Sequence, residues 1–483
     1  MKFSLIIFLL FISIFCDEKL FFAFTHFRHG ARAPIFPSDS EVDDYGMPWT
    51  NPGELTPGGH RMHYLLGVYN RKRYIPTLLN EKYDPHDIYI ISSDYNRTIQ
   101  SALSQLQGLY PADNSIKLNE QQKKYSIPEL SKANIDAMKE EINELGDAQL
   151  PNYMRLIPVH TFQEAQMRYR NFEHPKCKQK AKEMMEPNVN NEIIKARLQT
   201  FDEEWKPYFE LFFTGDKAKE AYDYETLEKL ADLFITDISE GFEFDEFKYK
   251  TGLNDTDLER LYTFFVEFVG RTMNNYQYGD PESKLIKLDM SKLFKELVDY
   301  IKKSIQREWE KQENQKVDYK DYSRPKLVMI SGHDSMVSVM LLFLGTMYGD
   351  REKFWKVPVY ASNIAFEVYN TKDTYSKDDY SQYTIKCLFN GELIEGATFK
   401  LDEFIEKVEQ TAWSQEQIDE FCTGQGEQKS ETKDEESNTL VIVLGITTGV
   451  FFILCIVFVI LWRKQKVSSA SVEGSPLMNS QND

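Results

Sequence analysis

The chain alternates strand-like apolar runs with helical patterns at both ends but not in its middle. From residue 18 to about 156, runs such as LFFAFTH and DIYIIS are each followed by a helical segment, and the pattern returns with KLVMISGHDSMVSVMLLFLG at residues 326–345. Repeated strand–helix units favour a parallel sheet covered by helices. The sequence therefore predicts an α/β fold, with a mainly parallel central sheet that a distant segment completes.

The middle of the chain has a different pattern. Between about 160 and 310 strand signals become rare, and charged segments with apolar residues at helical spacing take over, as in NNEIIKARLQTFDEEWKPYFELFF. We interpret this part as a helical cap inserted into the sheet domain. The expected domains are a core formed by 17–158 and 316–422 and a cap formed by 159–315.

Two apolar runs predict targeting and membrane anchoring. Residues 1–16, MKFSLIIFLLFISIFC, are typical of a signal peptide, with an uncleaved anchor as the alternative. Thr439–Trp462 carries no charge, and at about 1.5 Å per residue it is long enough to cross the hydrocarbon core as one transmembrane helix. The basic RKQK that follows places the tail 463–483 in the cytosol and the long N-terminal part on the luminal or outer side, as a single-pass type I protein. Residues 423–438 are polar and are expected to form a stalk.

The tail and the luminal cysteines add weaker signals. EGSPLM, at residues 473–478, resembles an acidic dileucine-type sorting signal, which favours a lysosome or endosome over the cell surface and a sorting adaptor as partner. Cys177, Cys387 and Cys422 allow one disulfide and one free thiol, and their spacing does not choose the pair. Asn96 and Asn254 are potential N-glycosylation sites.

Charged residues follow three of the predicted strands. Arg28-His29 ends the first, Arg97 follows the second, His333-Asp334 ends the third, and Arg32 lies just beyond the first. The carboxyl ends of neighbouring parallel strands meet at one crevice, so these residues are expected to form one site. The chain as a whole has a formal charge of −19, which argues against nucleic acid as a partner.

Such a site is suited to a phosphoryl group. Three guanidinium groups that converge without a counter-ion need a bound anion, and planar guanidinium groups match tetrahedral oxyanions. A metal held by His26 and His29 is the rival, but the stretch offers arginines where a divalent ion would need carboxylates or thiolates. We therefore expect neither a metal nor a cofactor.

The same residues suggest a mechanism. His29 can attack phosphorus while Asp334 protonates the leaving oxygen. Nearby arginines should lower the pKa of His29 and keep it neutral, whereas Asp334 must hold a proton. This pair would favour an acidic optimum.

RHGARAP, Arg28–Pro34, matches the RHGxRxP signature of the histidine acid phosphatases, and SGHDSMVS resembles their second motif. The resemblance extends over most of residues 20–425 and is closest to the lysosomal and prostatic type. It implies a phosphoglycerate mutase-like fold and hydrolysis of phosphate monoesters through a phosphohistidine on His29, with Asp334 as proton donor. It also implies that the phosphate is bound by Arg28, Arg32, Arg97 and His333.

The resemblance further implies a disulfide between Cys177 and Cys422, a free Cys387 and a possible homodimer. The chain lacks some of the family's other cysteines. A glycan on Asn96 would crowd Arg97, so we predict that Asn96 is unmodified and that Asn254 is the glycosylation candidate. The alternatives are a phytase or inositol-phosphate phosphatase of the same family, and a catalytically inactive type I membrane glycoprotein that acts as a receptor.

Overall fold

The computed structural model describes residues 18–35, 45, 49, 51–113, 117–162, 177, 179–180, 192–213, 222–273, 282–315 and 323–423. The predicted signal peptide, transmembrane helix and cytosolic tail lie outside these residues, as does the predicted stalk apart from Thr423. Within the described part of the chain, no helix is both long and apolar enough to cross a membrane.

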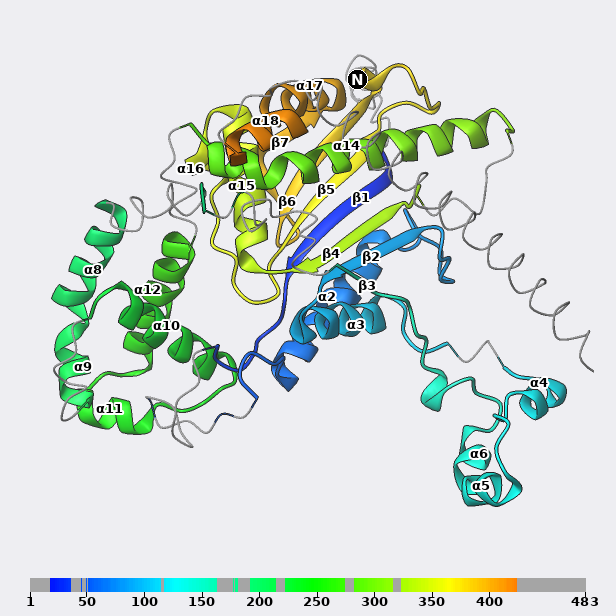
Figure 1. The fold of residues 1–483 in the computed structure, drawn as a ribbon, viewed down its shortest axis with the longest axis horizontal. Helices are drawn as coiled ribbons and strands as arrows, with labels where there is room; N and C mark the ends of the chain where they lie inside the picture. Colours follow the sequence, from blue (N-terminus) through cyan, green and yellow to red (C-terminus); the bar gives the residue numbers. More distant parts are fainter. Residues whose placement is uncertain are drawn as a thin grey trace, which may run out of the picture. The chain divides into compact units, whose positions relative to one another are not determined.

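A seven-stranded sheet forms the centre of the described fold (Figure 1). Its strand order is β3-β2-β4-β1-β5-β6-β7. In chain order the strands are β1 (Lys19–Arg28), β2 (Ile88–Ser93), β3 (His160–Phe162), β4 (Leu327–Gly332), β5 (Asn363–Asn370), β6 (Tyr383–Phe389) and β7 (Glu392–Lys400).

The sheet is mixed, which corrects the expectation of a mainly parallel one. β3, β2, β4 and β1 pair in parallel, whereas β5, β6 and β7 are added as antiparallel strands. A two-residue turn, Asn390-Gly391, joins β6 to β7, and both residues have positive φ. Such a turn matches the twist of a hairpin, so the last strands fold back without a crossover helix.

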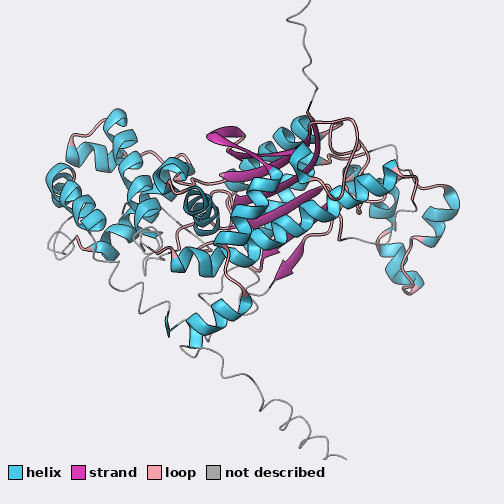
Figure 2. Ribbon diagram, turned by 90° about the horizontal axis from the view of Figure 1, so that it is seen from above, coloured by secondary structure: helices cyan, strands magenta, loops and turns pink. Residues whose placement is uncertain are grey.

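Helices cover both faces of the sheet (Figures 1 and 2). On one face, α14 (Lys284–Gln312), α15 (Asp334–Tyr348) and α17 (Leu401–Thr411) bury apolar side chains against β1, β4, β5 and β6. On the other, α2 (Pro57–Tyr74) and α3 (Asn96–Leu109) pack on β1, β2 and β4. The α/β class is thus confirmed.

Helices α2 and α3 cross closely because both carry glycine at the crossing. A Cβ on Gly67 would lie 1.9 Å from the carbonyl oxygen of Gln105, and one on Gly108 would lie 2.1 Å from that of Tyr64. No larger residue fits at this distance. The crossing fixes α3, and with it the position of Arg97 near the start of that helix.

A second group of helices has a core of its own. It consists of α8 (Glu192–Glu204), α9 (Lys206–Phe212), α10 (Tyr224–Ser239), α11 (Asp245–Thr251) and α12 (Asp255–Met273). Buried aromatic rings, including Phe201, Phe209 and Phe234, fill its interior. The expected cap range of 159–315 also includes α14, but α14 packs against the sheet. The domain boundaries themselves stay a prediction.

Shorter helical segments complete the described chain: α4 (Glu120–Tyr125), α5 (Lys132–Ala137), α6 (Lys139–Leu145), η1 (Pro151–Tyr153), α16 (Arg351–Phe354), η5 (Tyr380–Gln382) and α18 (Gln415–Thr423). A disulfide joins Cys177 to Cys422 in α18, which is the pair that the resemblance implied. Cys387 in β6 is a free, buried thiol.

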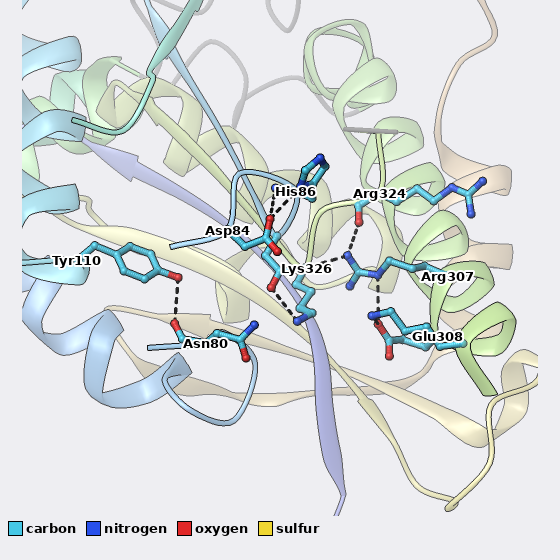
Figure 3. A network of polar contacts seen from close by, with 10 residues as sticks. Asn80, Asp84, His86, Tyr110, Arg307, Glu308, Arg324 and Lys326 are labelled. Carbon is cyan, nitrogen blue, oxygen red and sulfur yellow. Dashed lines mark hydrogen bonds and ion pairs between the residues drawn. The ribbon is translucent and has the colours of Figure 1, made fainter. Parts of the chain in front are cut away.

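A charged network lies at the amino ends of β2 and β4 (Figure 3). Asp87 precedes β2, and its carboxylate lies 2.8 Å from Lys326 Nζ and 3.8 Å from an Arg307 nitrogen. The carbonyl oxygen of Asp87 accepts from the backbone N–H groups of Lys326 and Leu327, at 2.8 and 2.9 Å. Glu308 also pairs with Arg307, at 3.1 Å. The network joins α14 to the starts of two neighbouring strands.

Candidate active site

The carboxyl ends of β1, β2 and β4 meet, as the sequence predicted. Arg28, at the end of β1, lies opposite Gly332 at the end of β4, and Ser92 in β2 lies opposite Ser331. The backbone N–H of His29 donates to the Gly332 carbonyl at 2.9 Å. The residues that follow these strands therefore lie at one edge of the sheet.

A cavity of about 290 Å³ opens at this edge. The six residues predicted to form one site all line it, namely Arg28, His29, Arg32, Arg97, His333 and Asp334. Side chains of α10 and α12 line it as well. The predicted convergence is confirmed, and helices of the middle segment supply further wall.

The ring of His29 has one defined tautomer. Its Nδ1 lies 2.8 Å from the Gly30 carbonyl oxygen. A carbonyl only accepts, so this contact assigns the proton to Nδ1 and leaves a lone pair on Nε2. Burial, then the charges of Arg28 and its neighbours, hold the pKa of His29 well below the usual value, in the direction that the sequence predicted.

Arg28 is paired inside the protein. It lies 3.0 Å from an Asp334 carboxylate oxygen, donates to the Pro358 carbonyl at 2.8 Å, and stacks 4.4 Å from the centre of the Tyr360 ring. Three partners from a different part of the chain thus hold this guanidinium in the cavity lining.

Arg32 is paired as well, by a residue that the sequence did not single out. Asp232, in α10, accepts from two of its nitrogens, at 2.7 and 3.4 Å. The expectation of three arginines without a counter-ion is therefore wrong for two of them. Protein carboxylates already neutralise Arg28 and Arg32.

Arg97 differs from the other two arginines. It stacks 4.4 Å from the Tyr95 ring, its Nε is buried without a hydrogen bond, and it forms no ion pair with any residue of the described chain. Burial and the nearby Arg32 charge lower its pKa. Of the three guanidinium groups, this one has the strongest need for an anion from outside.

Asp334 corrects a second expectation. Burial alone would raise its pKa, but Arg28, His333 and the Ser335 N–H, which donates to its carboxylate at 2.8 Å, lower the pKa below the usual value. Asp334 is thus an ionised partner of Arg28. We expected a proton on Asp334 because the mechanism needs an acid there, and its 3.0 Å pair with Arg28 cannot be read from the order of residues.

The other histidines near the site differ in exposure: His26 and His63 are buried, whereas His333 is only partly buried and lines the cavity. His333 Nε2 lies 3.2 Å from the Ser93 hydroxyl, which ties the end of β4 to the end of β2. His63 Nε2 lies 3.1 Å from the Arg28 carbonyl oxygen. His26, the rival metal ligand, is buried away from the cavity lining, and the described residues contain no group of three or more metal-ligating side chains.

Several cavity residues were missed by the sequence reasoning. They are chiefly Glu228 and Asp232 of α10, Tyr262 of α12, and Tyr360. Burial raises the pKa of Glu228 above the usual value. The α10 segment is one acidic amphipathic helix among several, so spacing alone did not distinguish its carboxylates from solvated ones.

The two glycosylation candidates are both exposed. Asn96 begins α3, and its side-chain amide donates to Glu54 at 2.9 Å, directly beside Arg97 of the cavity. Asn254 accepts from the backbone N–H groups of Thr256 and Asp257 at the start of α12. The unmodified state of Asn96 and a glycan on Asn254 stay predictions.

Known proteins resemble this chain in both sequence and fold. A family model described as the histidine phosphatase superfamily (branch 2) matches residues 31–390. Prostatic acid phosphatase of Mus musculus is 41% identical over 113 residues, which are 22% of this chain and 29% of that protein. Lysosomal acid phosphatase of Xenopus laevis is 37% identical over 97 residues, 20% of this chain and 22% of that protein. The match thus spans less than a third of each relative.

Among solved structures, the phytase from Citrobacter braakii superposes with a TM-score of 0.51 at 14% identity, covering 82% of this chain and 98% of that one. At this identity the likeness concerns the fold alone.

Proposed function

This chain belongs to the histidine phosphatase superfamily (branch 2), and from that premise we propose that it is an acid phosphatase that hydrolyses phosphate monoesters. One observation carries the proposal: residues from three strand ends, predicted to act together, line one cavity, and one of them, Arg97, forms no ion pair with the residues that the structure describes. A phosphoryl dianion supplies the charge that Arg97 lacks.

The reaction has two displacement steps. In the first, His29 Nε2 attacks phosphorus, a P–N bond forms, and the P–O bond to the leaving group breaks while Asp334 gives its proton to the leaving oxygen. In the second, water attacks phosphorus, the P–N bond breaks, and Asp334 takes the proton of that water as inorganic phosphate forms. The Gly30 carbonyl, 2.8 Å from Nδ1, supports the positive charge that the ring carries in between.

Substrate binding protonates Asp334 in this scheme. A phosphoryl dianion competes with Asp334 for Arg28 and repels its carboxylate, and both effects raise its pKa. Asp334 is therefore an ionised partner of Arg28 before substrate binds and a proton donor in the complex. Acidic solution further favours its protonation.

Small monoesters and phosphoproteins fit the cavity better than highly phosphorylated substrates. The described residues of α10 and α12 that line the cavity include no lysine or arginine, so further phosphate groups of inositol phosphates would find no positive partner on that wall. The phytase alternative is therefore disfavoured. The inactive-receptor alternative is also disfavoured. A receptor would not need a His29 ring that is neutral and held in one tautomer, whereas a nucleophile does.

An assay at acid pH tests the proposal. Purified full-length protein is expected to release phosphate from a simple monoester and to be trapped as a phosphohistidine on rapid acid-free quenching, and His29→Ala should lose both signals. Equal activity in His29→Ala would refute the proposal that this site is an enzyme active site. A preference for inositol hexakisphosphate over simple monoesters would favour the phytase alternative.

For the ends of the chain we propose a signal peptide at 1–16, a transmembrane helix at 439–462 and a lysosomal or endosomal location with the catalytic part luminal. The charge-free run and its basic flank support the span and its orientation, and similarity to lysosomal acid phosphatases supports the compartment. Deletion of the tail 463–483 should shift a tagged protein to the cell surface. An unchanged location would remove the role of EGSPLM.

A further inference from the structure

We propose that Asp232 is a positioning residue of the phosphate site, which holds Arg32 in the cavity and so controls how tightly phosphate binds. The proposal rests on the proposed function for the identity of the ligand, a phosphoryl group. It adds a role for α10, a helix outside the strand-end motifs.

Asp232 contacts the Arg32 guanidinium through both of its carboxylate oxygens. One carboxylate oxygen lies 2.7 Å from an Arg32 terminal nitrogen, and the other lies 3.4 Å from the second terminal nitrogen. That second oxygen also accepts from the Ile35 backbone N–H at 2.9 Å. The side chains of Arg32 and Asp232 are only 7% and 12% exposed. A two-point contact of this kind fixes both the place and the plane of a guanidinium.

Arg32 has little else to hold it. Its other hydrogen bond goes to the neighbouring Ala33 carbonyl at 3.0 Å, and the Tyr360 ring centre is 6.0 Å away. An arginine side chain has many rotamers, and ordering it only when the ligand arrives weakens binding. Asp232 orders the side chain beforehand and leaves other N–H donors of Arg32 for the ligand.

The charge of Asp232 gives the proposal a distinctive signature. When Arg32 is present, its charge cancels that of Asp232, and the benefit of positioning dominates. When Arg32 is absent, Asp232 is an uncompensated carboxylate that repels phosphate. Removal of this carboxylate should therefore weaken phosphate binding in the first case and strengthen it in the second.

A purely structural role would behave differently. α10 is also anchored to the first part of the chain by Asp237, which accepts from the Trp49 ring nitrogen at 2.7 Å, and by Glu240, which accepts from the Thr56 hydroxyl. If Asp232 were merely another anchor, its loss would disturb the cavity whether or not Arg32 were present. Asp237, buried in the same helix and outside the cavity lining, provides the matched control.

The experiment is a double-mutant cycle on the full-length protein, with inorganic phosphate as the probe and direct binding as the readout. Asp232→Asn should weaken phosphate binding about tenfold in the otherwise natural chain. In the Arg32→Met background the same change should strengthen binding at least about threefold. Asp237→Asn should shift binding by the same factor in both backgrounds.

Equal weakening by Asp232→Asn in both backgrounds would overturn the proposal and leave Asp232 as an anchor. If Asp232→Asn does not fold, Asp232→Glu replaces it: it keeps the charge, so it should weaken binding in the natural background and leave the Arg32→Met protein as weak as before. A natural protein that neither binds phosphate nor hydrolyses monoesters would instead refute the proposed function, which is a separate result.

Discussion

The two ends of the parallel strands carry the same kinds of charged side chain, but the two ends differ in how completely these charges form ion pairs. At the amino ends of β2 and β4, the carboxylates of Asp87 and Glu308 pair with Lys326 and Arg307 (Figure 3). At the carboxyl ends, Arg97 forms no ion pair within the described chain. Matched charges hold elements together, whereas an unmatched buried charge creates a place for a ligand of opposite sign.

The strongest test of this contrast concerns proton donation at the carboxyl end. Asp334→Asn should lower kcat by about 10³ for an alkyl phosphate, because the leaving alkoxide then finds no acid. The loss should be much smaller for p-nitrophenyl phosphate, whose leaving group departs without protonation. Steady-state kinetics at acid pH provide the measurement, and equal losses for both substrates would rule out Asp334 as the donor.

The unmatched arginine should matter for binding rather than for stability. Arg97→Met should lower kcat/KM by about 10- to 100-fold, because a charge-assisted contact to phosphate is lost. The free energy of unfolding should change by less than about 1 kcal/mol, since no ion pair is broken. Denaturant titration alongside kinetics measures both, and a large loss of stability would show that Arg97 is matched after all.

The matched end should respond in the opposite way. Asp87→Asn should lower the free energy of unfolding by about 3 kcal/mol, because Lys326 loses its buried carboxylate partner at 2.8 Å and Arg307 keeps only that of Glu308. At temperatures well below unfolding, kcat and KM should stay within about twofold of the natural values. A selective loss of kcat in this variant would mean that the two ends are coupled.

The smallest expected effect concerns His63 and the pH dependence of the free energy of unfolding. Burial lowers the pKa of His63 to about 4, so the folded protein keeps this ring neutral while the unfolded chain takes up a proton below about 6.5. Stability is therefore lost as pH falls from about 6.5 towards 4. His63→Gln should reduce the stability difference between pH 7 and pH 5 by about 2 kcal/mol. Unfolding titrations at both pH values check this, and identical differences in the two proteins would contradict it.

The strand-end residues could be predicted from the sequence because strand, charge and helix follow one another locally there. Arg28, Arg97 and His333 come together once the parallel register is assumed, and β1, β2 and β4 adopt that register. β7 was missed, although Asn390-Gly391 is a local hairpin signal of the kind that marks such a strand.

What the sequence could not predict depends on contacts between distant segments. Asp232 reaches Arg32 across 200 residues, from a helix whose acidic side chains look alike in sequence. The ionised state of Asp334 depends on its 3.0 Å approach to Arg28, which no pattern encodes. Both concern how charges are partnered, and partnership is decided by packing rather than by composition.

The buried thiol of Cys387 can serve as a probe for opening of the sheet. Its thiol is fully enclosed in β6, between strands β5 and β7, and burial raises its pKa, so it is doubly protected from thiol reagents while the sheet is intact. The rate at which Cys387 is labelled therefore measures how often the antiparallel strands around it open. Comparing that labelling rate with and without phosphate would reveal whether phosphate bound at the strand ends changes how often the antiparallel strands β5, β6 and β7 open.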